Sequence, residues 1–258
     1  MKDVKVILTG AAGRMGRAVT AFAETDNRVS VVCAVDVSPV QSSVPFYHGI
    51  DEVSTSLGAD IIVDFSHHTA IEGILNYAKK AKCAVVICTT GHTDAELELI
   101  KEASSEIAIF RSGNMSLGIN LLMALVKKAA ATLSGFDIEI IEKHHNQKLD
   151  APSGTAIMLA DAARQGVDYD AELVYDRHSV REKRKPAEIG MHSVRGGNIV
   201  GEHEVIFAGH DEIITLSHSA RSREVFARGA ISAAAFMKGK GAGMYSMKEV
   251  IDSIVSNI

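Results

Sequence analysis

Alternation between short apolar runs and amphipathic helical patterns is the feature that most constrains the fold of this chain. In its first half the runs are apolar throughout, which predicts strands of a parallel sheet covered by helices on both faces. This is an α/β fold, a Rossmann-like doubly wound parallel sheet with right-handed crossovers. The predicted strands are Val4–Thr9, Val29–Asp36, Ile61–Phe65, Ala84–Thr89 and Ile107–Phe110, and the predicted helices are Arg14–Glu24, Thr69–Lys80 and Asp94–Ala103, with Asp94 as the cap of the last.

The alternation of single strands and helices ends after about Asn114. Residues 188–218 read as consecutive strands with turns at Gly196-Gly197 and Gly209–Asp211, which predicts a smaller α+β domain with an open, mainly antiparallel sheet. We expect residues 1–115 and 222–258 to form a dinucleotide-binding domain and residues 116–221 to form a substrate-binding domain. The other predicted elements are a strand at Phe136–Glu142 and helices at Leu117–Leu133, Ser153–Arg164, Ser222–Met237 and Met247–Val255.

Composition excludes several classes of function. Aromatic residues make up 5% with no tryptophan, and the net charge is −5, so a platform for bases or a surface for nucleic-acid phosphates is disfavoured. Cys33, Cys83 and Cys88 lack CxxC spacing, which favours reduced core thiols in a reducing compartment. No signal peptide precedes the first strand, and no apolar run approaches the roughly 18 residues of a membrane span. We expect a cytoplasmic protein with no membrane or nucleic-acid partner.

A glycine-rich turn, G-A-A-G-R-M-G at residues 10–16, lies between the first predicted strand and the first helix. Glycines here let the backbone approach a pyrophosphate, and the helix N-terminus supplies N–H donors. The spacing departs from G-x-G-x-x-G at Ala12, so an ordinary strand-to-helix turn is the alternative. Asp36, about 20 residues beyond the turn, ends the second strand where an acidic side chain binds an adenosine ribose. The pattern predicts a bound dinucleotide.

Asp36-Val37 favours NADH because a carboxylate repels a 2′-phosphate, whereas Arg14 can offset that repulsion and leaves NADPH open. Phe65 and Thr89–Gly91 lie at the ends of the third and fourth predicted strands, at the edge where ligands bind such sheets. From these patterns the predicted cofactor contacts are Gly10, Ala11, Ala12, Gly13, Arg14, Gly16, Asp36, Phe65, Thr89, Thr90 and Gly91.

Residues 142–156, here called the His/Lys segment, read E-K-H-H-N-Q-K-L-D-A-P-S-G-T-A. Imidazole and ammonium groups donate protons, and a helix opening at S-G-T offers N–H groups to an anion. The alternatives are a solvated polar loop or a metal site. A metal is disfavoured because the two adjacent histidines lack a third ligand, and Asp150 is expected to orient the loop or to pair with a lysine and not to act as a base. Histidines 178, 192, 203, 210 and 218 share no spacing and are expected to be mostly structural.

The His/Lys segment resembles the signature of the 4-hydroxy-tetrahydrodipicolinate reductase (dihydrodipicolinate reductase) family, and the resemblance is nearly end to end. Supporting motifs are G-A-A-G-R-M-G-R, D-F-S, C-T-T-G-H, S-G-N-M-S-L-G-I-N-L, R-G-G-N-I-V-G-E-H and S-R-E-V-F-A-R-G-A. Asp36 stands where many members have Glu, and Val37 replaces a frequent Arg, which leaves the cofactor preference open.

The resemblance implies reduction of 4-hydroxy-tetrahydrodipicolinate by NADH or NADPH with loss of water, in the diaminopimelate route to lysine. It assigns acid/base positions to His144 and Lys148. A small dicarboxylate substrate and a homotetramer joined through the sheet of the second domain are also implied. The implied substrate contacts are His145, Lys148, Ser153, Gly154 and Thr155, and the further cofactor contacts are Met15, Ser112, Asn114 and Met115.

Two other functions remain open from the residues alone. One is another two-domain NAD(P)-dependent dehydrogenase of amino-acid-like substrates, which would lack the His/Lys signature. The other is a non-catalytic NAD(H) sensor, which would not need His144, Lys148 and the S-G-T helix start together.

Overall fold

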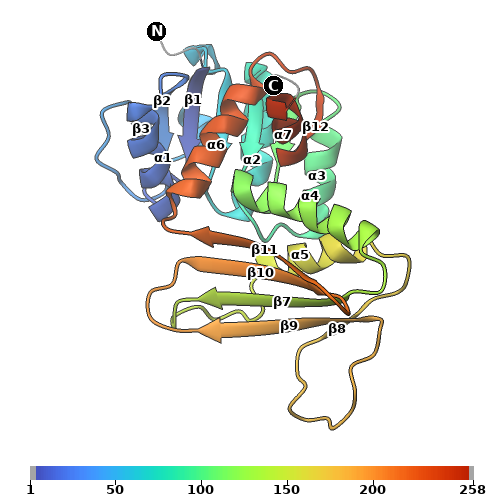
Figure 1. Ribbon diagram of the computed structural model, residues 1–258. Helices are drawn as coiled ribbons and strands as arrows, with labels where there is room; N and C mark the ends of the chain where they lie inside the picture. The colour runs from blue at the N-terminus through green and yellow to red at the C-terminus, as the bar shows by residue number, and fades with distance from the viewer. Residues whose placement is uncertain (1–3, 256–258) are drawn as a thin grey trace. The chain divides into compact units, whose positions relative to one another are not determined.

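The computed structural model describes residues 4–255 of the chain (Figure 1). The described residues divide into two compact units. The first contains the chain up to Leu117 together with the segment from Arg223 onward, and the second is Gly118–Ser222.

The first unit is built on a seven-stranded sheet in which every pair of neighbours is parallel. In the strand order β12-β6-β5-β4-β1-β2-β3, the chain adds β2 and β3 on one side of β1 and then β4, β5, β6 and β12 on the other side. This change of side at β1 is typical of dinucleotide-binding folds. The predicted Rossmann-like class is therefore confirmed. The strands are β1 Val4–Thr9, β2 Val29–Val35, β3 Phe46–Tyr47, β4 Ile61–Asp64, β5 Ala84–Ile87, β6 Ala108–Arg111 and β12 Gly243–Tyr245.

Helices cover both faces of this sheet because successive strand residues point to opposite sides. Leu8 and Val63 pack in one apolar cluster, whereas their neighbours Ile7 and Ile62 pack in another. The first cluster is covered by α1 Arg14–Thr25, α6 Glu224–Met237 and α7 Met247–Val255, and the second by α2 Ile71–Ala81 and α3 Asp94–Ala103. Short 3-10 turns lie at Ile50–Glu52, Thr55–Leu57 and His68–Ala70.

The predicted cap of α3 was wrong by one residue. Thr93 is the N-cap, because its side chain accepts a hydrogen bond from the N–H of Glu96 while the Glu96 carboxylate accepts from the N–H of Thr93. Asp94 instead occupies the first helical turn, where a negative charge favours the helix dipole.

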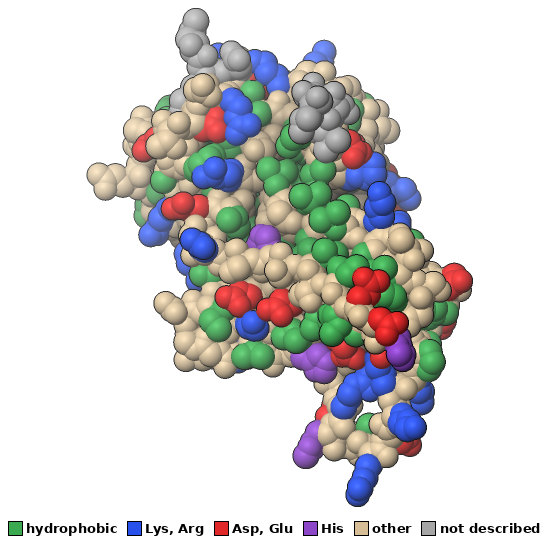
Figure 2. Space-filling view, in the orientation of Figure 1, with side chains coloured by type: hydrophobic (Ala, Val, Ile, Leu, Met, Phe, Trp, Pro, Cys, Tyr) green, Lys and Arg blue, Asp and Glu red, His purple; other side chains and the backbone are tan. Residues whose placement is uncertain are grey.

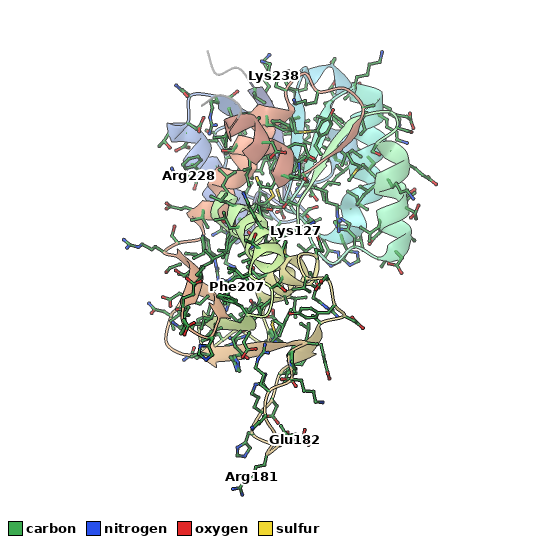
Figure 3. The ribbon with its side chains drawn as sticks, turned by 45° about the vertical axis from the view of Figure 1, so that its right-hand side comes forward. Lys127, Arg181, Glu182, Phe207, Arg228 and Lys238 are labelled. Atoms are coloured by element: carbon green, nitrogen blue, oxygen red, sulfur yellow. The ribbon has the colours of Figure 1, made fainter. Side chains whose placement is uncertain are left out.

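The second unit packs α4 Leu117–Thr132 and α5 Gly154–Arg164 on a five-stranded sheet of order β11-β10-β7-β9-β8. Buried apolar side chains of β7, β9 and β10 face these helices, and Phe207, labelled in Figure 3, is fully buried among them. The strands are β7 Asp137–His144, β8 Glu172–Val174, β9 Glu188–Arg195, β10 Gly201–Ala208 and β11 Ile213–Ala220.

This sheet is mixed rather than mainly antiparallel, which corrects the sequence prediction. The hairpin at Gly209–Asp211 joins antiparallel β10 and β11 as expected. The Gly196-Gly197 turn does not make a hairpin, because β7 lies between β9 and β10 and pairs parallel with β9. Its glycines bond the end of β7 instead: the N–H of Gly196 donates to the carbonyl of His144 (2.9 Å) and the carbonyl of Gly197 accepts from Asn146 (3.2 Å).

The segment between β8 and β9 projects from the sheet of the second unit (Figure 1). Arg181 and Glu182 lie near its tip (Figure 3), and basic side chains dominate it in Figure 2. At its base, Arg184 pairs with Asp137 (2.7 Å) and Glu139 (3.1 Å) of β7, which anchors the segment to the sheet.

Candidate active site

The predicted glycine loop, residues 10–16, packs backbone against backbone. Gly10 has a φ of +74°, and a Cβ at this position would overlap the carbonyl oxygen of Phe65. A Cβ on Gly16 would likewise overlap the carbonyl oxygen of Gly10. Gly13 occupies the N-cap of α1 and has no side chain to bond the first-turn N–H groups. These features leave the helix N-terminus suited to an anion such as a pyrophosphate.

Asp36 ties the glycine loop to the end of β2. Its two carboxylate oxygens accept hydrogen bonds from the N–H groups of Ala12 (2.9 Å) and Ser38 (2.9 Å). A carboxylate retains further lone pairs after two such bonds and can still accept from ribose hydroxyls. A pocket of about 540 Å³ adjoins this carboxylate. Its described lining includes Asp36, His48 and Asp51 and contains no lysine or arginine.

A buried carboxylate shapes the neighbouring turn after β4. Asp64 is 1% exposed and accepts hydrogen bonds from the hydroxyl of Thr9 (2.6 Å) and from the N–H (3.0 Å) and hydroxyl (2.5 Å) of Ser66. The turn presses Phe65 against Gly10, and Thr89 donates to the carbonyl of Ser66 (3.4 Å). The ends of β1, β4 and β5 are thereby fixed to one another.

The remaining predicted cofactor residues follow the same edge of the sheet. Thr90 and Gly91 are exposed beyond β5, and Ser112 donates to the carbonyl of Asn114 (2.7 Å) beyond β6. Met115 is buried, and its carbonyl lies against Gly229 of α6. The loops after β1, β2, β4, β5 and β6 all leave the carboxyl edge of a parallel sheet, which is the ligand-binding edge of such folds. Exposed Arg14 and half-buried Met15 begin α1 beside the glycine loop, and Ala11 is buried within it.

In the second unit, β7 extends two residues beyond the prediction and ends on His144. Glu142 and His144 are two positions apart on this strand and therefore share its helix-covered face. Both are buried, and His144 Nδ1 lies 2.5 Å from the carboxylate of Glu142. Arg195 of β9 donates from both terminal nitrogens to that carboxylate (2.7 and 2.8 Å), and the N–H of Ser153 adds a third donor (3.2 Å).

His203 of β10 completes this buried cluster. Its Nε2 lies 3.1 Å from the hydroxyl of Ser153, and its ring meets that of His144 edge to face at 5.2 Å. Burial and the adjacent His144 lower the pKa of His203 to about 4, so this imidazole is neutral near pH 7. Ser153 also caps α5 by accepting from the N–H of Ala156 (3.1 Å).

The other predicted residues of the His/Lys segment lie in the connection from β7 to α5 or in the first turn of α5. Lys148 forms an ion pair with Asp150 (2.8 Å), as the sequence predicted for that carboxylate. His145 is half-buried beside the end of β7, and Gly154 and Thr155 form the first turn of α5. The predicted residues His144, Ser153, Gly154 and Thr155 thus lie on two elements linked through the Glu142 carboxylate.

The sequence analysis assigned no role to Glu142, Arg195 or Ser193. Period-two spacing from His144 places Glu142 on the same strand face, which is a signal in the sequence. Arg195 and Ser193 come from β9, and only the parallel pairing of β7 with β9 brings them opposite this carboxylate.

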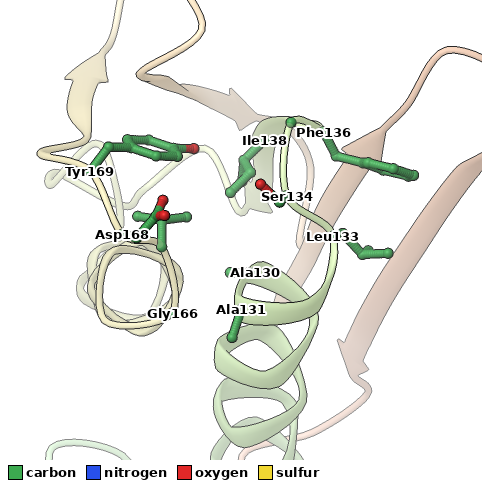
Figure 4. A pocket seen from close by; sticks show the side chains of 11 residues that line it. Ala130, Ala131, Leu133, Ser134, Phe136, Ile138, Gly166, Asp168 and Tyr169 are labelled. Atoms are coloured by element: carbon green, nitrogen blue, oxygen red, sulfur yellow. The ribbon is translucent and has the colours of Figure 1, made fainter.

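A separate small cavity, of about 110 Å³, lies at the end of α4 (Figure 4). Ser134, Phe136, Asp168 and Tyr169 are among its lining residues, and none of the predicted site residues lines it. Among residues 4–255, we find no group of three or more His, Cys, Asp or Glu side chains arranged to hold a metal ion. No described helix has the length and apolar character needed to cross a bilayer.

The doubly wound sheet with its glycine loop, and a second unit carrying a buried Glu–His pair beside a helix N-terminus, define a class: two-domain, nucleotide-dependent oxidoreductases. Comparisons with known proteins specify the family. Residues 4–115 match the family model "Dihydrodipicolinate reductase, N-terminus" and residues 118–251 match "Dihydrodipicolinate reductase, C-terminus". The chain belongs to the dihydrodipicolinate reductase family.

Similar proteins cover nearly the whole chain. The 4-hydroxy-tetrahydrodipicolinate reductase of Caldanaerobacter subterraneus subsp. tengcongensis is 52% identical, covering 96% of this chain and 98% of that protein. The enzyme of the same name from Clostridium botulinum is 46% identical over 96% of this chain and 98% of its own length. The dipicolinate-bound dihydrodipicolinate reductase of Paenisporosarcina sp. TG-14 has the same fold, with a TM-score of 0.80, 22% identity and coverage of 95% and 97%.

Proposed function

We propose that this chain reduces 4-hydroxy-tetrahydrodipicolinate to tetrahydrodipicolinate with NADH or NADPH, releasing water, in the diaminopimelate route to lysine. The observation that carries the proposal is the His144–Glu142 contact of 2.5 Å beside the α5 N-terminus, within a chain of this reductase family. The site offers a buried imidazole, an ammonium and helix N–H groups, which suit an anionic substrate that must be protonated.

Each group has a defined part in this reaction. His144 and Lys148 supply protons. One proton is needed because hydroxide leaves the ring as water, and another neutralises the negative charge that hydride addition leaves on the product. The α5 N-terminus at Ser153–Thr155 and the His145 side chain bind the substrate carboxylates. A bound NADH or NADPH supplies hydride. The glycine loop and the 540 Å³ pocket beside Asp36 fit its pyrophosphate and adenosine.

A coupled assay tests the proposal directly. Aspartate semialdehyde, pyruvate and the synthase that precedes this step generate the substrate, and loss of the absorbance of the reduced nicotinamide reports turnover. We expect turnover that depends on the synthase. NADH binding without any turnover would contradict the proposal and favour a sensor.

Cofactor preference follows from the charge of the pocket, and NADH is the proposed cofactor. Asp36 and Asp51 line the pocket, and its described lining offers no lysine or arginine for a 2′-phosphate. Val37, 86% exposed, stands next to Asp36. Val37→Arg is expected to move the ratio of kcat/KM values toward NADPH by about tenfold, which corresponds to one added charge-assisted contact of about 1.4 kcal/mol. Steady-state kinetics with both cofactors check this, and an unchanged ratio would contradict it.

The assembly is a cytoplasmic homotetramer joined through the outer face of the five-stranded sheet, the side turned away from α4 and α5. This face includes Ile141, Ile206, Val194 and Ile213, of which Val194 is 45% and Ile213 68% exposed. Lys143 is already paired there with Glu202 and Glu204 (3.4 and 3.0 Å), so its charge is balanced within the face. Figure 2 shows hydrophobic and acidic side chains intermingled over the strands of this unit.

A further inference from the structure

Glu142 is the most enclosed ionisable group of the second unit's site, and its protonation state can be deduced. The side chain is 1% exposed. Burial opposes its ionisation, but hydrogen bonds from Arg195, Ser193 and His144 outweigh burial and lower the pKa of Glu142 to about 2. The two-pronged contact with Arg195 neutralises the charge inside the fold. Glu142 is therefore a carboxylate, which only accepts hydrogen bonds.

This state of Glu142 fixes the tautomer of His144. Because the carboxylate has no proton to give, the hydrogen in the 2.5 Å contact belongs to His144 Nδ1. Nε2 is then the only ring nitrogen that can exchange a proton with a substrate. A Cβ on Gly201 would lie 3.0 Å from Nε2, so this glycine leaves the space beside that atom open.

The neighbouring ionisable groups do not compete with the hydrogen bond between His144 and Glu142. His203, the nearest ring, is neutral near pH 7 because its pKa is lowered to about 4. Lys148 pairs with Asp150, and Arg195 also donates to the carbonyl of Asp150 (2.7 Å). The Glu142 carboxylate is thus left to balance the positive charge of Arg195 and of a protonated His144.

We propose that Glu142, held ionised by Arg195, is a positioning residue for the reaction: it orients His144 with Nε2 toward the substrate and stabilises its imidazolium form. The inference rests on the proposed function, in which His144 is a proton donor. It adds a residue that acts through His144 and not on the substrate. An ionised carboxylate behind a catalytic histidine has this effect on tautomer and charge in other enzymes.

Glu142→Gln tests the proposal with nearly unchanged shape. Arg195 would bind the amide oxygen, which turns the amide NH2 group toward His144. His144 Nδ1 would then have to accept a hydrogen bond from this NH2 group, and the single proton of the neutral imidazole would lie on Nε2. We expect kcat to fall by about 100-fold or more, with the substrate KM changed less than about threefold. The pH range of maximal kcat should shift to lower pH, a change that a purely structural defect would not produce.

Two further variants separate positioning from stability. Glu142→Asp keeps the charge and is expected to recover at least about tenfold of the kcat lost in Glu142→Gln. Glu188→Gln is the matched control, because Glu188 is also buried and paired with an arginine (Arg177, 2.8 Å), at the opposite end of β9 from Arg195. It should keep wild-type kcat. A kcat in Glu142→Gln equal to wild type, or equal to that of Glu188→Gln, would overturn the proposal.

Nitrogen-15 NMR of histidine-labelled wild-type protein gives a readout that does not depend on activity. The His144 signals, assigned by their loss in His144→Ala, should show a proton on Nδ1 at neutral pH. A proton on Nε2 alone would overturn the inference. If wild-type protein showed no turnover, the proposed function would fail by itself, and this tautomer measurement would still decide the role of Glu142.

Discussion

At the scale of single residues, the site of the second unit depends on strand geometry. Glu142 and His144 alternate with Ile141 and Lys143 along β7, so the Glu142–His144 pair faces the helices while its neighbours face outward. The buried Glu142 side chain can carry a negative charge because Arg195 and the N–H of Ser153 donate hydrogen bonds to its carboxylate. Removing any one partner would leave a buried charge or acceptor unsatisfied.

His144→Ala tests whether this histidine is the proton donor that we propose. We expect kcat to fall by about 10²–10⁴-fold, because a positioned general acid contributes that much, while NADH affinity changes little. Steady-state kinetics and NADH fluorescence titration measure the two quantities. His210→Ala, at a side chain 96% exposed, is the control and should match wild type. Unchanged turnover in His144→Ala would remove this histidine from the mechanism.

His203 predicts how stability depends on pH. Its folded pKa of about 4 lies below the ordinary 6.5, so the unfolded chain binds the proton more tightly and protonation favours unfolding. The stability attributable to neutral His203 should therefore be lost as pH falls from 6.5 toward 4, by up to about 3 kcal/mol. His144, Glu142, His218 and Lys148 act on the same ring electrostatically.

His203→Gln isolates this contribution from the other titrating groups. The urea midpoint of wild-type protein should fall more steeply between pH 6.5 and 4 than that of the variant. The stability that depends on ionised Glu142 is lost between its unfolded pKa of 4.5 and its folded pKa of about 2, which overlaps this window only at its lower end. Parallel pH curves for the two proteins would contradict the assignment.

At the scale of elements, the turn from β1 into α1 is determined by close backbone approach. Gly16→Ala would place a methyl group against the carbonyl of Gly10 and displace the loop that we propose holds the cofactor. We expect NADH affinity to fall by about tenfold or more, since about 1.4 kcal/mol of lost contact suffices for that. Gly241→Ala is the control, because a Cβ there meets nothing within 4 Å. Equal NADH affinity in both variants would contradict the proposal that close backbone packing at Gly16 shapes the cofactor-binding loop.

Element prediction succeeded where the pattern is local and failed where it is not. β1, α3 and α7 lie where the apolar periodicity places them. The two- and three-residue strands β3, β8 and β12 were not predicted, because so few residues show no period. The pairing of β7 between β9 and β10 depends on contacts distant in sequence, so a glycine pair that resembles a hairpin turn was misassigned.

At the scale of the whole molecule, the proposed tetramer can be tested through the outer sheet face. Ile206→Glu would place a carboxylate on this face of the sheet, and covering that charge with a partner subunit would cost desolvation free energy that opposes association. We expect wild-type protein to have the mass of four 27.6 kDa chains by light scattering and the variant to have a smaller mass. Leu99→Glu, at an exposed leucine of α3 in the first unit, should leave the mass unchanged. A variant that keeps the wild-type mass would place the interface elsewhere.

The sequence by itself determined the doubly wound class, the glycine loop and the family, because apolar periodicity, glycine spacing and the His/Lys signature are local properties of the chain. Only the tertiary structure decided that the second sheet is mixed and that Arg195 and His203 meet Glu142 and His144. These residues are some 50 to 60 positions apart in the chain, and the pairing of β7 with both β9 and β10 brings them together. Burial then sets their protonation states, and burial is a property of the folded chain.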